Sequence, residues 1–208
     1  MDMKNTERDS NSNLSLLEHF SQIVDTHGDR IAVEDKITKT SYIELDVLSD
    51  QMAVNLIKYG VGTGSNVAVC LPRSLHLSAV LIAIIKCGAC YVPIDPDAPI
   101  ARQAIVIDQA KATHSIGKIE TNADLCSVSM IELLTFNNGD IATGTDCLNT
   151  NICLFFTSGS TGIPKGVAIT QNAILNLVIN PNYVSIFPGA RMAHWANPTF
   201  DAQLFEIW

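Results

Sequence analysis

The chain has 208 residues, of which 47% are hydrophobic and only 16% are charged. This length allows one or two domains with a sizeable core, and the low charge content suits buried parallel strands and helices. The formal net charge of −8 argues against a protein that binds nucleic acid or an anionic membrane surface.

Two features of the sequence bear on location. Residues 1–13 are polar and lack the apolar stretch of a signal peptide, and we expect them to be disordered. The longest apolar run, Leu75–Ile85, stops at Lys86 and is too short to span a bilayer. We therefore expect a cytoplasmic protein without a membrane partner.

The six cysteines do not suggest a disulfide framework in a chain of this size. Cys87 and Cys90 form a C-x-x-C pair, but Cys126, Cys147 and Cys153 supply no second pair, and no histidines stand at zinc-ligand spacing. We therefore interpret Cys87 and Cys90 as small buried hydrophobic residues, and we predict no metal site formed by protein side chains.

Residues 14–60 predict a helix, two short strands and a second helix. The first helix, Leu14–Thr26, carries its large apolar side chains on one stripe. Short strands are expected at Ile31–Val33 and around Thr40. The S-x-x-E sequence that begins at Ser41 is a capping box, which predicts a helix that ends at Gly60.

Residues 67–136 predict a regular alternation of strands and helices, followed by a polar connecting loop at residues 137–151. The aspartates of the D-P-D-A-P sequence, Asp95 and Asp97, lie between prolines, and we interpret them as structural turn residues. The expected elements are strands at Val67–Leu71, Cys90–Ile94, His114–Ile116 and Ser127–Met130, and helices at Ser74–Lys86 and Ala101–Ala110.

The last part of the chain predicts a strand, a loop, a second strand and a helix that Thr170 caps. The expected elements are strands at Ile152–Phe156, Val167–Ile169 and Met192–Trp195, and helices from Thr170 to about Ile179 and from Phe200 onward. Because strands and helices alternate and several strands are apolar on both faces, we predict an α/β fold with largely parallel sheets flanked by helices. We expect a first α/β subdomain at residues 14–136 and the start of a second at residues 152–208.

The stretch from Thr157 to Gly166, TSGSTGIPKG, contains four hydroxyls, three glycines and one lysine. Glycines let backbone N–H groups approach an anion, hydroxyls donate to its oxygens, and lysine offsets its charge. The stretch is not a Walker A loop, because Pro164 precedes Lys165 and glycine follows it. Composition alone leaves two readings open, a polyphosphate-binding loop and a flexible surface hairpin.

The order of these residues resembles the phosphate-binding signature of the adenylate-forming superfamily of AMP-binding enzymes, and the match is unbroken from Thr157 to Gly166. Two earlier stretches agree with that resemblance. Thr40–Leu45 is similar to the family's "TYxEL" segment. Ile85–Pro96, with Pro99 and Arg102, resembles the "LKAGAAYVPIDPxxPxxR" segment of the nonribosomal peptide synthetase branch, in which alanines stand at the positions of both C-x-x-C cysteines.

A fourth stretch, Phe200–Glu206, resembles the "FDASVxE" segment of amino-acid-activating domains, with Gln203 where serine is usual. The resemblance implies that Asp201 holds the α-ammonium group of the substrate. The alternative is an aspartate on the surface or at a helix N-cap. By the same resemblance, Ala202 and Phe205 line a side-chain pocket for a branched aliphatic amino acid such as valine or isoleucine. We expect no catalytic role for His194, which resembles a core or rim histidine.

The resemblance implies that a substrate carboxylate attacks the α-phosphate of ATP, giving an acyl adenylate and pyrophosphate. Positioning and charge stabilisation dominate such chemistry. The triphosphate implies Mg²⁺, and we assign neither a protein ligand for it nor a catalytic residue. The residues implied in ATP binding are Thr157, Ser158, Ser160 and Thr161 through hydroxyls, Gly159 and Gly162 through close backbone approach, and Lys165 through its charge.

We therefore expect the N-terminal portion of an adenylation domain, which works with phosphopantetheine on a peptidyl carrier protein domain. The family's later motifs have no match here, so we expect a fragment that is inactive without the remainder of the domain. Two alternatives remain open: part of an acyl- or aryl-acid-activating CoA ligase, for which Asp201 is unexpected, and a non-catalytic remnant or an interaction piece that needs a partner chain.

Overall fold

The computed structural model describes residues 14–121, 123–137, 148–157, 164–179 and 181–208. Its centre is a six-stranded sheet with the order β6-β5-β3-β4-β7-β8, in which only β8 runs antiparallel to its neighbour. The strands are β3 (Asn66–Cys70), β4 (Cys90–Pro93), β5 (His114–Gly117), β6 (Cys126–Val128), β7 (Asn151–Thr157) and β8 (Lys165–Thr170). The predicted α/β class with a largely parallel sheet is confirmed.

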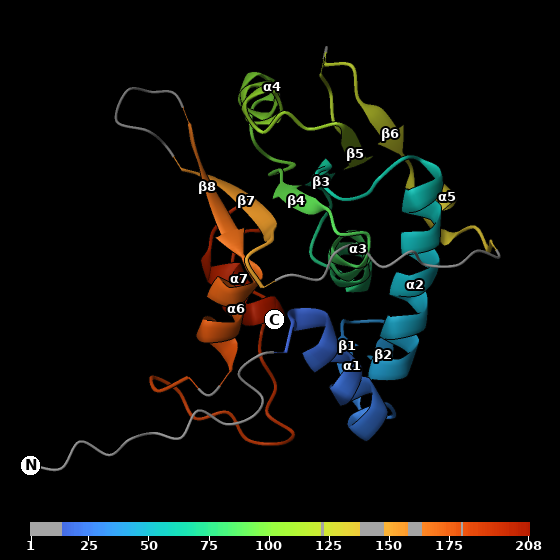
Figure 1. The fold of residues 1–208 in the computed structure, drawn as a ribbon, viewed down its shortest axis with the longest axis vertical. Helices are drawn as coiled ribbons and strands as arrows, with labels where there is room; N and C mark the ends of the chain where they lie inside the picture. The colour runs from blue at the N-terminus through green and yellow to red at the C-terminus, as the bar shows by residue number, and fades with distance from the viewer. Residues whose placement is uncertain (1–13, 122, 138–147, 158–163, 180) are drawn as a thin grey trace, which may run out of the picture.

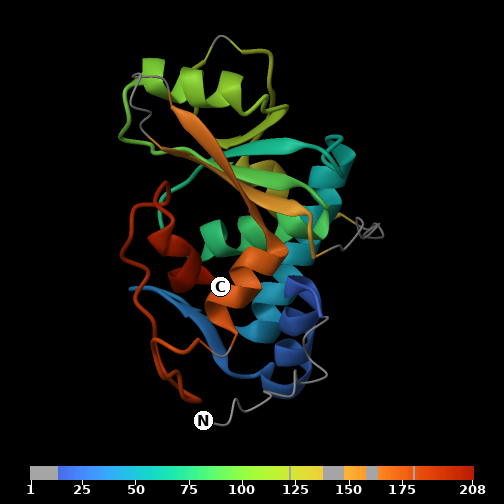
Figure 2. The ribbon, with the colours of Figure 1, turned by 60° about the vertical axis from the view of Figure 1, so that its left-hand side comes forward.

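Helices cover both faces of this sheet (Figures 1 and 2). Helices α2 (Tyr42–Lys58) and α3 (Leu75–Lys86) lie on one side, and α4 (Ile100–Gln109) lies on the other. The remaining helices are α1 (Leu16–His27), α5 (Met130–Leu134), α6 (Gln171–Val178) and α7 (Ala202–Ile207). A separate antiparallel pair, β1 (Ile31–Glu34) and β2 (Lys39–Ser41), packs beside α2.

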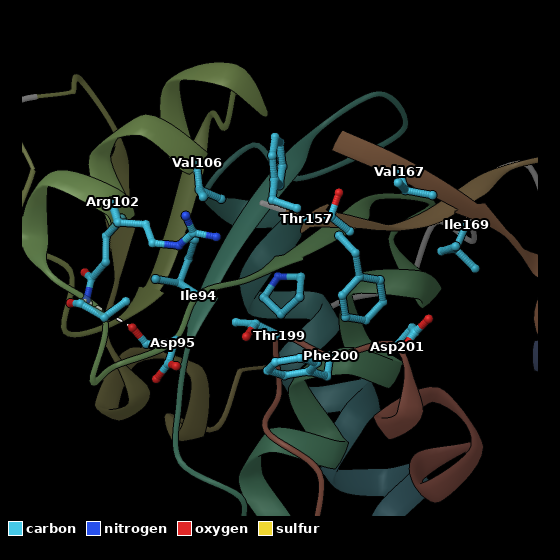
Figure 3. A pocket seen from close by; sticks show the side chains of 15 residues that line it. Ile94, Asp95, Arg102, Val106, Thr157, Val167, Ile169, Thr199, Phe200 and Asp201 are labelled. Carbon is cyan, nitrogen blue, oxygen red and sulfur yellow. Dashed lines mark hydrogen bonds between the residues drawn. The ribbon is translucent and has the colours of Figure 1, made fainter. Parts of the chain in front are cut away.

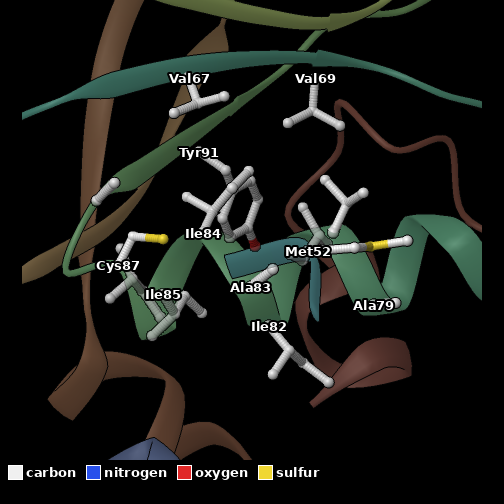
Figure 4. Packing of buried hydrophobic residues seen from close by; sticks show 14 of the residues in the cluster. Met52, Val67, Val69, Ala79, Ile82, Ala83, Ile84, Ile85, Cys87 and Tyr91 are labelled. Atoms are coloured by element: carbon white, nitrogen blue, oxygen red, sulfur yellow. The ribbon is translucent and has the colours of Figure 1, made fainter. Parts of the chain in front are cut away.

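Alternation along β3 divides the core into two layers. Val67 and Val69 face the larger cluster with α2 and α3, whereas Ala68 and Cys70 face the smaller cluster with α4. Figure 4 shows Tyr91 of β4 among the buried side chains of the larger cluster. Strands that are apolar on both faces therefore form the middle of the three layers, as parallel strands do.

Local sequence explains the starts of three helices. Ser15, Ser41 and Ser129 each accept a hydrogen bond from the backbone N–H three residues later, and the glutamate at that position bonds back to the serine N–H. These reciprocal bonds satisfy N–H groups that a helix start otherwise leaves unpaired. The capping box at Ser41 was predicted, and the one at Ser129 was missed together with α5.

A buried lysine ties α3 to α2. Lys86 Nζ lies 2.6 Å from Asp46 Oδ1 and 2.5 Å from Asp50 Oδ1, and it donates to Ser49 Oγ at 2.8 Å. The Phe20 ring of α1 lies 5.8 Å from the same ammonium group. Since a buried charge is tolerated only when it is paired and hydrogen-bonded, these partners explain why the last residue of an apolar helix is a lysine.

The thiols of Cys87 and Cys90 are buried, and burial raises the pKa of each to about 12. Both cysteines are free. The prediction that they serve as small hydrophobic residues is confirmed, since thiols with such pKa values are poor nucleophiles and poor ligands at neutral pH.

One expected strand is absent. Residues 192–195 are described and form no strand. The backbone N–H groups of Trp195 and Ala196 donate to the Glu206 carboxylate, at 2.9 and 2.8 Å, and not to a neighbouring strand. The prediction of a strand at Met192–Trp195 was therefore wrong, because a side chain of α7 takes the donors that a sheet would need.

The division of the chain at residues 137–151 stays a prediction. The sheet crosses it, because Tyr91 of β4 pairs with Cys153 of β7. Strands β7 and β8 thus extend the sheet that residues 66–128 begin. Among the described residues, no helix is long and apolar enough to cross a membrane.

Candidate functional site

A cleft of about 490 Å³ opens at the carboxyl ends of β4 and β7. Ligands of open α/β sheets bind at such strand ends, where loops and helix starts converge. Five segments line the cleft: Pro93–Asp95 at the end of β4, Ala98, Arg102, Gln103 and Val106 in and before α4, Phe155–Thr157 of β7, Val167 and Ile169 of β8, and Thr199–Asp201 before α7.

The cleft wall is mostly apolar, and charged groups stand at its sides. In the view of Figure 3, Arg102 and Asp95 lie on one side and Asp201 on the other, with Thr157 between them. Such a cleft can hold an apolar group and place a cation beside Asp201 and an anion beside Arg102.

The β7–β8 hairpin brings the two described ends of the predicted phosphate loop together. Thr157, the last residue of β7, is opposite Lys165, the first residue of β8, and both are exposed. No ion pair joins Lys165 to another residue in the described part of the chain. The predicted residues Ser158–Gly162 lie outside the described residues, so only the two ends of the loop are placed.

Asp201 immediately precedes α7, and its side chain makes no capping hydrogen bond. It is exposed and lines the cleft. Asp201 is therefore an exposed residue at the N-cap position of α7, as the alternative expected, but its side chain does not cap the helix and is left available to a ligand.

Ala202 and Phe205, the other two residues predicted to bind substrate, are not among the residues that line this cleft. Ala202 is exposed at the start of α7, and the Phe205 ring packs against Tyr183 with 5.7 Å between ring centroids. Their role in a side-chain pocket stays a prediction. The structure thus brings Thr157 and Asp201 to one cleft, with Lys165 next to Thr157.

Sequence reasoning missed several residues of the cleft. Asp95, interpreted as a turn residue, lines it and accepts a hydrogen bond from Asn197 Nδ2 at 2.8 Å. Thr199 and Phe200 also line it. The place of Asp95 directly after a buried strand was a usable signal, because the ends of parallel strands converge on the ligand edge of the sheet.

His194 shortly precedes Thr199–Asp201, one of the segments that line the cleft. Its Nε2 atom is buried without a hydrogen-bond partner among the described residues. Burial lowers the pKa of His194 from its ordinary value of 6.5; Glu206 opposes this shift, and Arg73 adds to it. His194 as a whole is half-buried, which agrees with a histidine at the rim of the core, and its lack of a catalytic role stays a prediction.

This depressed pKa predicts a loss of stability in mild acid. Below pH 6.5 the unfolded chain protonates His194 while the folded chain does not, so the free energy of unfolding falls with pH until the folded pKa is passed. Urea unfolding at pH 7 and pH 5.5 should therefore show a smaller acid-induced loss in His194→Gln than in the wild type. Met192→Gln, which removes no titrating group, should keep the wild-type loss. Equal losses in all three proteins would contradict the prediction.

Among the described residues, no group of three or more His, Cys, Asp and Glu side chains could hold a metal ion. A bound substrate can also supply metal ligands. The oxygens of a triphosphate are such ligands, since Mg²⁺ is usually held by one or two carboxylates together with phosphates and waters.

The family model described as AMP-binding enzyme matches residues 20–208. Malpibaldin synthetase of Mortierella alpina is 36% identical over 91% of the chain, and cyclosporin synthetase of Tolypocladium inflatum is 36% identical over 94%. The chain spans 4% and 1% of the lengths of these two relatives.

Solved structures share the fold. The N-terminal subdomain of Klebsiella oxytoca NpsA covers 95% of the chain with a TM-score of 0.88 and 23% identity, and the chain spans 52% of it. PA1221, a nonribosomal peptide synthetase protein that contains adenylation and PCP domains, covers 95% of the chain with a TM-score of 0.85 and 24% identity, and the chain spans 35% of it. NpsA has also been solved with 3-hydroxybenzoyl-AMSN, with a TM-score of 0.84 and 24% identity.

Proposed function

Because the chain belongs to the family of AMP-binding enzymes, we propose that it forms the N-terminal part of an amino-acid adenylation domain of a nonribosomal peptide synthetase. The reaction joins an amino acid and ATP into an aminoacyl adenylate and pyrophosphate, and then transfers the aminoacyl group to a carrier thiol. The supporting observation is one cleft that is lined by both Thr157, which pairs with Lys165 in the β7–β8 hairpin, and Asp201.

The phosphate end of this cleft is the β7–β8 hairpin. Thr157 donates its hydroxyl to phosphate oxygens, and Lys165 offsets the charge of the phosphates and of the departing pyrophosphate. The hydroxyls and glycines of residues 158–162 complete this loop in our proposal. Mg²⁺ accompanies the triphosphate, and we assign it no ligand among the residues of this chain.

The amine end is Asp201. A carboxylate at the side of a largely apolar cleft pairs with an α-ammonium group and discriminates against acids that lack one. In our proposal, Ala202 and Phe205 line the pocket for a branched aliphatic side chain. This specificity requires α7 to present them to the substrate together with residues outside this chain.

The partner we propose is a carrier domain bearing phosphopantetheine, in a cytoplasmic synthetase. The supporting observations are the synthetase relatives and the PCP domain of PA1221. Since the chain spans about half of the NpsA subdomain, at 52%, we propose that efficient adenylation requires the residues of the remaining half.

An aryl-acid ligase is the second candidate. The phenylalanines that line the cleft, Phe155, Phe156 and Phe200, suit an aromatic acid, and NpsA was solved with a hydroxybenzoyl ligand. Asp201 opposes this candidate, because a carboxylate without a cationic partner raises the cost of binding an uncharged ring. Preference for amino acids over aryl acids in a binding assay separates the two candidates.

The first test is calorimetric titration of the chain with Mg-ATP. We expect a Kd in the micromolar to millimolar range (about −8 to −4 kcal/mol) and a loss of about tenfold or more in Lys165→Ala. Lys118→Ala is the control, because the Lys118 side chain is 89% exposed and lies outside the cleft. Unchanged affinity in Lys165→Ala would contradict the assigned role. A cooperatively folded wild type that does not bind would support the non-catalytic remnant.

A further inference from the structure

The segment that carries Asp201 is held at its start by two charged side chains. Arg73, which follows β3, donates from Nη1 to the carbonyl oxygens of Trp195 and Ala196. Glu206 of α7 accepts from the N–H groups of the same two residues. The main-chain groups of Trp195 and Ala196 are therefore bonded on both sides, although they belong to no strand.

The next residue, Asn197, bonds in three directions. Its Nδ2 donates to Asp95 Oδ2 at 2.8 Å. Its Oδ1 accepts from the backbone N–H of Thr199 at 2.9 Å and from the Thr199 hydroxyl at 2.8 Å. Its carbonyl oxygen accepts from the Phe200 N–H at 2.9 Å. One amide side chain thus shapes the turn that leads to Asp201 and joins that turn to a distant segment.

Asp95 is itself fixed within the turn that links β4 to α4. Its Oδ1 accepts from the backbone N–H of Asp97 at 2.9 Å. Its carbonyl oxygen accepts from Gln103 Nε2 of α4 at 3.1 Å and from the Ala98 N–H at 3.2 Å. The carboxylate therefore offers Asn197 an anchor that is tied to both the sheet and a helix.

We propose that Asn197 is a positioning residue, and that its hydrogen bond to Asp95 sets the place of Thr199–Asp201 against the ends of the strands. Both Asp95 and Thr199 line the cleft, so the bond joins two sides of the cleft itself. A side chain that selects a substrate acts only when its supports hold it in place. The effect on substrate rests on the proposed function, because it requires Asp201 to bind the amine.

The geometry allows a reciprocal exchange of the two side chains. In Asp95→Asn/Asn197→Asp, the asparagine introduced at position 95 can still accept from the Asp97 N–H and can donate across the cleft. The aspartate introduced at position 197 can accept that bond with one oxygen and both Thr199 bonds with the other. Asn197→Asp alone places two carboxylates against each other. Asp95→Asn alone, with its oxygen still on the Asp97 N–H, turns an amide NH2 toward Asn197 Nδ2, so that two donors face each other.

Amide hydrogen exchange followed by NMR tests the proposal without a ligand. We expect the Thr199 and Phe200 amides to exchange about tenfold faster in each single variant and to return to within about twofold of the wild type in the reciprocal variant. Asp97→Asn/Asn182→Asp is the matched control, since it makes the same changes of residue type outside the cleft and should leave these amides unchanged. The β3 amides report whether a variant has lost its global fold.

Two exchange results would overturn the proposal: wild-type rates in both single variants, or rates in the reciprocal variant as fast as in Asn197→Asp. If Asn197→Asp loses its global fold, the comparison of Asp95→Asn with the reciprocal variant decides.

L-Valine in the presence of Mg-ATP is the ligand probe, and we expect the affinity to fall about tenfold in the single variants and to recover in the reciprocal one. A full-length parent domain that does not bind L-valine contradicts the proposed substrate, while the exchange rates still decide the role of Asn197.

Discussion

Replacing Gly117 with alanine should lower the free energy of unfolding by about 3 kcal/mol or more, and thus strongly destabilise the chain. Gly117 ends β5 with a φ of +92°, a conformation that L side chains rarely adopt. A Cβ atom there would also collide with the carbonyl oxygen of Cys70 and lie 3.2 Å from Leu71 Cδ2. Because Cys70 pairs with Gly117 in the sheet, neither backbone can move away without disturbing the β3–β5 pairing.

Alanine substitutions at two other glycines distinguish the cost of backbone strain from the cost of the steric collision. Gly64 has a φ of +87° with nothing within 4 Å of an added Cβ, so Gly64→Ala should cost only about 1 kcal/mol. Gly62 has open space and no positive φ, so Gly62→Ala should be close to neutral. Urea unfolding of the three variants measures their free energies of unfolding, and we expect the largest loss in Gly117→Ala and the smallest in Gly62→Ala. A loss in Gly117→Ala no larger than that in Gly64→Ala would show that the collision is relieved at little cost.

The elements were predictable because their signals are local. The capping box at Ser41 predicts the start of α2, and apolar runs such as Val67–Leu71 predict strands buried on both faces. Strand order is not local. That β4 lies between β3 and β7, with β5 on the far side of β3, depends on packing between segments far apart in sequence.

The wrongly predicted strand at residues 192–195 has the same non-local origin. Residues 192–195 have a strand-like composition, but Glu206 and Arg73 bind their backbone groups from other elements. No pattern within the segment reveals those partners. The short helix α5 was predictable in principle, since Ser129 and Glu132 repeat the S-x-x-E pattern that marked α2.

The candidate site was predictable where a continuous motif carries it and not where side chains from different segments meet. The resemblance picked out Thr157, Lys165 and Asp201, and the structure places Thr157 and Asp201 on one cleft. The contact between Asp95 and Asn197 joins residues that are 102 positions apart in the sequence. Only the folded arrangement brings them within hydrogen-bond distance.

Asp201→Asn should reduce the preference of the cleft for an amino acid over its deaminated analogue by about 100-fold (about 2.7 kcal/mol). Asparagine keeps the shape of the side chain and removes the negative charge that pairs with the ammonium group. Because Asp201 is exposed and makes no capping bond, the variant should retain the wild-type melting transition. The loss of preference would therefore report on recognition and not on folding.

Calorimetric titration in the presence of Mg-ATP measures this preference with matched pairs, such as L-valine with 3-methylbutanoate and L-isoleucine with 3-methylpentanoate. Each pair keeps the side chain and the carboxylate and differs in the amine, so the ratio of affinities isolates the contribution of the ammonium group. Asp108→Asn removes an exposed charge on α4 outside the cleft and should keep the wild-type ratio. A ratio in Asp201→Asn equal to that of the wild type would mean that the amine is bound elsewhere. A wild type that prefers the deaminated acids would favour the aryl- and acyl-acid ligases, because Asp201 would then not pair with an ammonium group of the substrate.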